Sequence, residues 1–156
     1  MVGQDPLLHA KTAKSNDNRK QYATFFLDEH YFGIEVEWVQ EILKFQEMTP
    51  VPLSPDYISG LINLRGQIVT AINLKRRLYS EDAPLSSDSM NLIVRSDEDV
   101  VSLLVDDVGD VLTLDDQWMH PVPPTLDSMK VDFLNSVCKL EDRLLIILNV
   151  PRVLAA

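Results

Sequence analysis

The chain has 156 residues, 46% of them hydrophobic, and a formal net charge of −10. Such an acidic chain is a poor partner for nucleic-acid phosphates or for an anionic membrane surface, so we expect neither. Its one cysteine, Cys138, excludes an intrachain disulfide, and no apolar run approaches the ~20 residues of a membrane-spanning helix. We therefore expect a cytoplasmic protein with no direct membrane insertion.

The first 21 residues differ from the rest of the chain in charge and pattern. They contain four Lys or Arg against two Asp, a balance of +2, so the remainder carries −12. They show no sustained hydrophobic period, which is typical of a mobile tail. We expect residues 1–21 to be a flexible tail and folded structure to begin near Tyr22.

From there on, short apolar runs alternate with turn residues. Clusters of Ser, Pro, Asp and Glu separate the runs, as in small sandwiches and barrels. The pattern predicts a mainly β fold with short accessory helices. Runs of strand length occupy residues 22–27, 31–36, 61–64, 68–74, 91–94, 100–105, 133–137 and 144–150.

Residues 36–45 are predicted to form an amphipathic helix. At 100° per residue their apolar side chains cover an arc of about 180°, wider than the roughly 100° stripe that one small core needs. The excess is explained either by burial between the two halves of the chain or by a partner groove. Trp38 is the candidate interface residue, because tryptophan is enriched at binding hot spots.

The chain also contains an internal repeat. A shift of 69 residues places Ile34 on Leu103 and Val39 on Val108, and a shift of 76 residues aligns the ends of the two halves. We therefore predict two similar small β-barrels in tandem, at about 22–80 and 91–156, with a linker at about 80–90. Exchange of strands at the ends of the barrels stays open.

The glycines and the arginine of residues 60–66 have no counterpart in the second half, which has residues 133–138 at the equivalent place. Gly60 and Gly66 bracket an apolar strand that includes Asn63, and glycines allow a sharp reversal or a close backbone approach. Arg65 lies at the end of this strand, where its planar guanidinium can bind a carboxylate. That carboxylate belongs either to a partner or to an acid of the same chain, and the sequence leaves both open.

The sequence contains no catalytic or metal-binding pattern. It has five glycines without a phosphate-binding loop, and its three histidines have no partners at metal-ligand spacing. The acidic group at 106–110 lacks the calcium-loop pattern, and Cys138 is best explained as a buried thiol. We expect no enzyme, no metal and no cofactor. A generic SH3-like module for proline-rich peptides is disfavoured, because the aromatic residues are scattered.

Six segments of the chain resemble the CheW-like family of chemotaxis coupling proteins, over about residues 22–155. The Asn-Leu-Arg-Gly block at 63–66 is the most specific of them. Ser136 departs from the family pattern, which usually has a glycine there. The matching segments are residues 31–36, 39–42, 49–52, 60–68, 103–108 and 142–149.

The resemblance implies two SH3-like five-stranded β-barrels in a non-catalytic adaptor. Such an adaptor couples transmembrane chemoreceptors to a cytoplasmic histidine kinase in chemotaxis signal transduction. The implied partners are the cytoplasmic tip of a methyl-accepting chemoreceptor and the regulatory domain of a CheA-type kinase, at receptor arrays on the inner face of the membrane. A coupling protein of another array, such as one for surface motility, stays an alternative. The residues expected at the partner surface are Val36, Trp38, Val39, Glu41, Gly60, Asn63, Arg65 and Gly66.

Overall fold

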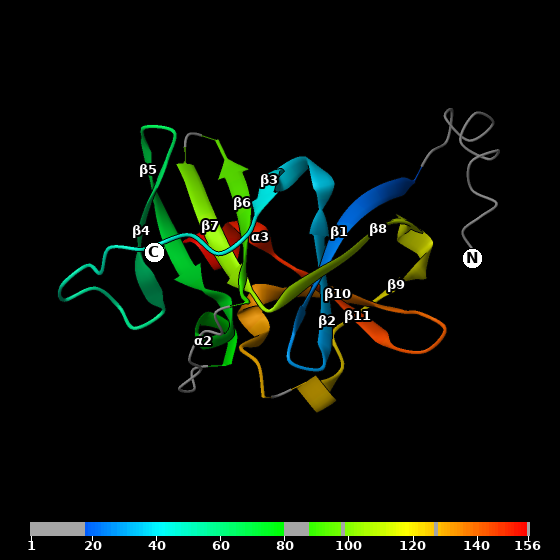
Figure 1. Cartoon of the computed structure of the whole chain (residues 1–156). Helices are drawn as coiled ribbons and strands as arrows, with labels where there is room; N and C mark the ends of the chain where they lie inside the picture. Colours follow the sequence, from blue (N-terminus) through cyan, green and yellow to red (C-terminus); the bar gives the residue numbers. More distant parts are fainter. Residues whose placement is uncertain (1–17, 80–87, 98, 127, 156) are drawn as a thin grey trace.

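The computed structural model describes residues 18–79, 88–97, 99–126 and 128–155. Most of the expected tail, at 1–17, and most of the expected linker, at 80–87, lie outside the described residues. The described part consists of two β-sheets with short helical segments, so the mainly β class is confirmed (Figure 1).

One sheet combines strands from both ends of the described chain. Its neighbours pair antiparallel except for the parallel pair β2·β11. In order across the sheet, the strands are β8 (Asp107–Asp115), β1 (Arg19–Leu27), β2 (His30–Glu35), β11 (Leu144–Leu148), β10 (Leu134–Lys139) and β9 (Met119–His120).

The second sheet has five strands, and its parallel pair is β5·β7. Its order is β3 (Val39–Leu43), β6 (Met90–Ser96), β7 (Asp99–Val105), β5 (Gln67–Asn73) and β4 (Ile58–Leu64). The α-helices are α2 (Leu74–Tyr79) and α3 (Val150–Leu154), and the 3-10 turns are η2 (Val36–Trp38), η3 (Asp116–Trp118), η4 (Pro124–Leu126) and η5 (Val131–Phe133).

The two sheets repeat one topology. The order β8-β1-β2-β11-β10 matches β3-β6-β7-β5-β4, with the parallel pair at the same place. Small features repeat as well: Asn73 caps α2 by accepting a hydrogen bond from the Arg76 amide at 3.2 Å, and Asn149 caps α3 through the Arg152 amide at 3.2 Å. Because β1 pairs with β8 and β2 pairs with β11, the sheets cut across the expected halves of the chain.

A shared core lies between the two sheets. Phe25 and Phe32 from the six-stranded sheet are fully buried, with ring centroids 5.7 Å apart, and pack in one cluster with Leu92 and Leu103 from the other sheet. Full burial of one such side chain stabilises by roughly 1.5–3 kcal/mol. Each sheet has a further cluster of its own, so both sheets are apolar on two faces.

Lys75 forms an ionic link between the two sheets. From α2, its Nζ lies 3.2 Å from Asp28 Oδ1 in the β1–β2 turn and 3.1 Å from Asp106 Oδ2 after β7. Burial by itself lowers the pKa of Lys75, but the hydrogen bonds and charges of the two carboxylates outweigh it and raise this pKa above 10.5.

Two expectations about local structure need correction. Strand β1 begins at Arg19, before Tyr22, because the main chain of residues 19–21 pairs with residues 113–115 of the long strand β8, which requires no apolar side chains. The predicted helix at 36–45 is wrong: η2 is followed there by strand β3.

A β-bulge explains the helical appearance of residues 36–45. Val39 lies opposite Val94 and Ile42 opposite Leu92, with the extra residue at Gln40. Val94 and Leu92 both belong to the shared core, so their strand partners Val39 and Ile42 lie on one face, where Val39 packs on that core and Ile42 is 43% exposed. Apolar residues three apart on one face imitate the spacing of a helix.

Candidate partner-binding surface

Glu41 and Arg65 form an ion pair between the two outer strands of the five-stranded sheet. Arg65 Nη2 donates to Glu41 Oε2, from the β4–β5 turn to β3. The Arg65 side chain is 67% exposed, and pairs at such a surface stabilise by about 0–1 kcal/mol. The sequence left open whether Arg65 pairs with a carboxylate of the same chain or of a partner. Within this chain its carboxylate is that of Glu41, which holds Arg65 only weakly.

The turn that carries Arg65 is strained. Leu64 pairs with Gln67, so Arg65 and Gly66 form a two-residue hairpin turn, and their φ angles are 51° and 90°. Such a turn needs positive φ at both positions and favours Asn-Gly; an arginine there costs roughly 1 kcal/mol. Asn63 supports the turn, because its Oδ1 accepts a hydrogen bond from the Gly66 amide at 2.9 Å. Strain of this kind gathers at functional sites.

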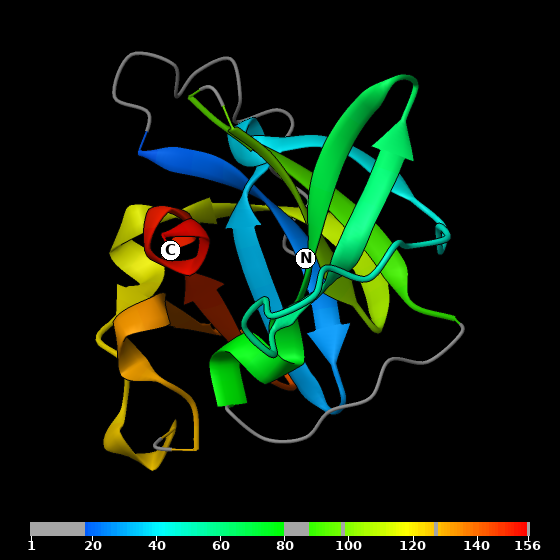
Figure 2. The ribbon, with the colours of Figure 1, turned by 90° about the vertical axis from the view of Figure 1, so that its left-hand side faces the viewer.

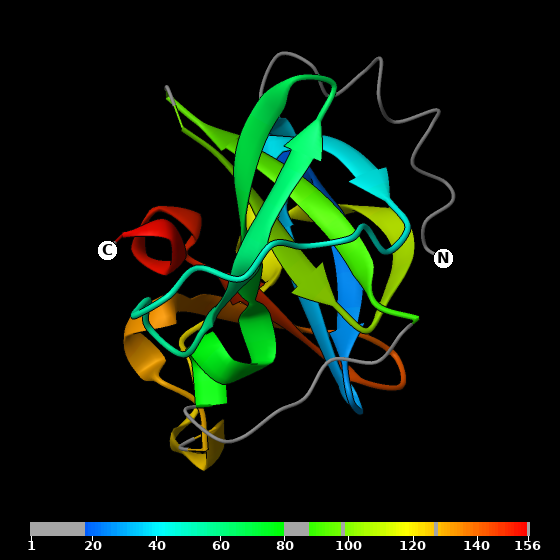
Figure 3. The ribbon, with the colours of Figure 1, turned by 60° about the vertical axis from the view of Figure 1, so that its left-hand side comes forward.

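Gly60 has an architectural role beside this turn. A Cβ on Gly60 would lie 2.7 Å from the Thr49 carbonyl oxygen, whose residue exchanges two backbone hydrogen bonds with Leu61 at 2.8 and 2.9 Å. The missing side chain thus lets the segment at 44–57 run alongside β4 (Figure 3). Between them is a groove of about 680 Å³, lined by Phe45, Gln46, Glu47, Met48, Thr49, Leu61 and Asn63.

The remaining expected residues contribute to the core. Val36, Trp38 and Val39 are half-buried and pack against the cluster shared by the two sheets. The structure therefore brings Glu41, Asn63, Arg65 and Gly66 together around one turn and places the other apolar candidates elsewhere.

Sequence reasoning missed apolar side chains near this turn. Ile68 is 60% exposed and lies opposite Asn63, on the same face of the hairpin. Phe45 is 41% exposed at the groove. The alternation of Ile68 with the buried Val69 could have revealed an outward-facing isoleucine, whereas nothing in the sequence marks Phe45.

The described residues include no group of three or more His, Cys, Asp or Glu side chains arranged to hold a metal ion. Nor is any helix among them long and apolar enough to cross a membrane. What the arrangement offers is an accessible guanidinium, a carboxylate and apolar side chains, which suits protein binding.

Comparison with known proteins identifies similarity over most of the chain. The model of the CheW-like domain matches residues 21–156. Chemotaxis protein CheW of Treponema pallidum is 27% identical over 157 residues, covering 97% of this chain and 92% of the relative. Chemotaxis protein CheW of Klebsiella aerogenes is 28% identical over 137 residues, covering 88% and 82%.

A solved structure agrees with the fold. The crystal structure of scaffolding protein TtCheW from Thermoanaerobacter tengcongensis matches with a TM-score of 0.80 and 29% identity, over 92% of each chain. The match confirms the expected fold class of two SH3-like β units with short helices.

Proposed function

The chain belongs to the CheW-like domain family and is a chemotaxis coupling adaptor, and we propose that it joins the cytoplasmic tip of a chemoreceptor to the regulatory domain of a CheA-type histidine kinase without catalysing a reaction itself. Its place of action is then the receptor array on the inner face of the membrane. The names of the relatives favour chemotaxis over a surface-motility array.

The Glu41–Arg65 pair is the observation that carries the choice of surface. A surface ion pair worth about 0–1 kcal/mol can be replaced by a similar pair with a partner, so a partner carboxylate competes with Glu41 for the guanidinium. The exposed Ile68 and the groove beside Asn63 add apolar contact area next to this charge. Charge and apolar area together make Arg65 a suitable anchor for a kinase or receptor segment.

Reconstitution with a receptor cytoplasmic fragment and the kinase tests this proposal. Arg65→Ala is expected to abolish most receptor stimulation of kinase autophosphorylation and to reduce co-sedimentation of the three proteins. Arg65→Lys is expected to restore only part of this stimulation, because an ammonium group cannot form a bidentate pair.

Arg95→Ala is the matched control. Arg95 is another exposed arginine of the same sheet, and its Nε donates to Gln40 Oε1 at 2.9 Å. The Arg95→Ala variant is expected to keep the coupling of receptor to kinase. Equal loss in both variants, or full coupling by Arg65→Ala, contradicts the assignment of this surface.

A further inference from the structure

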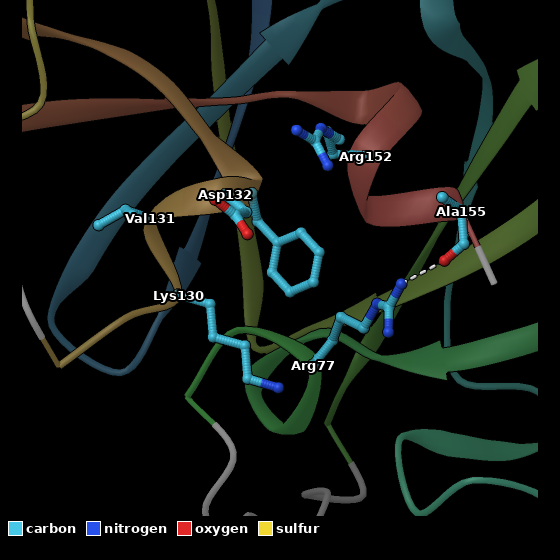
Figure 4. Close-up of a pocket in the computed structure, with 7 residues that line it drawn as sticks. Arg77, Lys130, Val131, Asp132, Arg152 and Ala155 are labelled. Atoms are coloured by element: carbon cyan, nitrogen blue, oxygen red, sulfur yellow. Dashed lines mark hydrogen bonds between the residues drawn. The ribbon is translucent and has the colours of Figure 1, made fainter.

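The segments α2, η5 and α3 lie near one another at the opposite end of β5 from the β4–β5 turn (Figure 2). A pocket of about 430 Å³ lies between them, and Figure 4 shows side chains that line it. Its lining carries three basic residues and one acidic residue in a chain with a net charge of −10. The local charge is therefore opposite to that of the molecule. The lining residues are Arg77, Lys130, Val131, Asp132, Phe133, Arg152 and Ala155.

Arg77 is held rigidly at one side of the pocket. Its Cζ lies 4.2 Å from the ring centroid of Tyr57 and 4.7 Å from that of Phe133, so the guanidinium is placed between two rings. Its Nε donates to the Val153 carbonyl at 3.1 Å and its Nη2 to the Ala155 carbonyl. Among the described residues, none accepts a hydrogen bond from Arg77 Nη1, so part of the rigid guanidinium remains available for an anion.

Lys130 and Arg152 add two exposed cations to the lining. Lys130 Nζ lies 6.0 Å from the Phe133 ring centroid, and Arg152 lines the same pocket from α3 (Figure 4). Within the described ranges, neither these two nor Asp132 takes part in an ion pair. The pocket thus has an uncompensated positive charge around an aromatic floor.

We propose that this pocket binds an acidic peptide segment of a partner protein, with a carboxylate on Arg77 between Lys130 and Arg152. An apolar neighbour in that segment packs on Phe133 and on Val131, which is 56% exposed. This proposal does not rest on the proposed function, since it uses neither Arg65 nor Glu41.

The lining favours a carboxylate over a phosphate group. Phosphate sites are commonly built from free backbone amides, whereas the amides of Lys130 and Phe133 donate to the carbonyls of Leu78 and Lys130. Asp132 also opposes a doubly charged ligand more strongly than a singly charged one. The apolar surface of Val131 and Phe133 has no use in binding a free inorganic anion.

Fluorescence anisotropy with the full chain tests the proposal. The probe is a labelled peptide in which glutamate alternates with leucine, and its comparison is the same peptide with glutamine. Only the glutamate peptide is expected to bind. The double variant Lys130→Glu with Arg152→Glu is expected to weaken its affinity by about tenfold or more.

The control variant is Lys44→Glu with Lys139→Glu, two exposed lysines outside the pocket with the same change in net charge. This control is expected to bind the glutamate peptide with an affinity within about twofold of that of the parent chain. Equal weakening in both variants, equal binding of the glutamine peptide, or no binding of either peptide overturns the proposal. So does inorganic phosphate that displaces the peptide at low concentration, since it identifies a phosphate site.

A melting measurement separates binding from internal pairing. Lys130 and Arg152 are exposed, so replacing both with glutamine is expected to leave the melting temperature unchanged and still weaken the peptide. A large fall in melting temperature shows that the charges are already satisfied within the chain, and it overturns the proposal.

Discussion

The carboxylate of Glu41 accepts a hydrogen bond from Arg65, although β3 and β4 are the first and last strands in the order of their sheet. The sheet must curl for its two edges to come this close. The pair therefore reports the closure of the sheet into a barrel, and it does so with an accessible guanidinium at the rim.

Arg65→Asn separates stability from coupling. Asparagine tolerates positive φ and is favoured in this turn, so the free energy of unfolding is expected to rise by up to ~1 kcal/mol despite the lost ion pair. Coupling of receptor to kinase is expected to fall as it does in Arg65→Ala. Denaturant melts and the kinase assay check the two outcomes, and a destabilised Arg65→Asn chain contradicts the strain argument.

Gly60→Ala is expected to destabilise the chain by about 1–3 kcal/mol, because the new methyl group meets the Thr49 carbonyl oxygen at 2.7 Å. Gly66→Ala is the comparison. Its Cβ meets no atom within 4 Å, so only the backbone conformation is penalised, by roughly 1 kcal/mol. Thermal unfolding of both variants measures the difference, and an equal loss would show that the contact with Thr49 relaxes freely.

The apolar residues of 36–45 are expected to divide into two groups. Val39→Ser removes a contact with the shared core and is expected to cost about 1–3 kcal/mol of stability. Ile42→Ser and Phe45→Ser alter side chains that are 43% and 41% exposed, so they are expected to keep stability and weaken partner binding. Uniform destabilisation, measured by urea melts, would mean that the exposed residues have no partner.

The raised pKa of Tyr22 predicts a loss of stability at alkaline pH. Burial of its phenol, with the charges of Glu35, Asp116 and Cys138, raises the pKa of Tyr22 from 10.0 to about 12. Between these values the unfolded chain releases the proton and the folded chain keeps it, so stability falls as pH rises through this range. The raised pKa of Lys75 acts in the same direction above 10.5.

Absorbance of tyrosinate measures this titration. One tyrosine is expected to ionise late in the parent chain, and Tyr22→Phe is expected to remove that late step. Normal ionisation of every tyrosine in the folded parent contradicts the burial argument.

Truncation tests where the fold begins. Deletion of residues 1–17 is expected to change the melting temperature by at most a few degrees. Deletion of residues 1–21 also removes the pairing of Arg19, Lys20 and Gln21 with β8 and is expected to lower it further. Identical melting of both truncated chains would show that this end of β1 contributes nothing.

The sequence predicts which segments form strands better than it predicts which strands pair with each other. The repeat is visible because equivalent strands keep their apolar pattern, as Ile34 and Leu103 do. Pairing of β2 with β11 is invisible, since both are continuous apolar runs that fit any central position. The bulge at Gln40 imitates a helix because periodicity alone does not register an extra residue.

For the candidate site, the turn at 63–66 is marked by its glycine and arginine, whereas the partner of Arg65 is not. Many acids could face it, and the choice of Glu41 depends on the curl of the sheet. The role of the site residues in binding stays a prediction. The pocket at Arg77 is also beyond sequence reasoning, because its lining comes from three separate segments.

The interleaved sheets have a consequence for synthesis on the ribosome. All strands of the five-stranded sheet have been translated by Val105, whereas β11, which lies between β2 and β10, is translated only at residues 144–148. Until then one edge of β2 has no neighbour, and the nascent chain carries an open apolar strand edge of the kind that aggregates or recruits chaperones. A premature stop before β11 therefore leaves a chain that can complete one sheet and never the other.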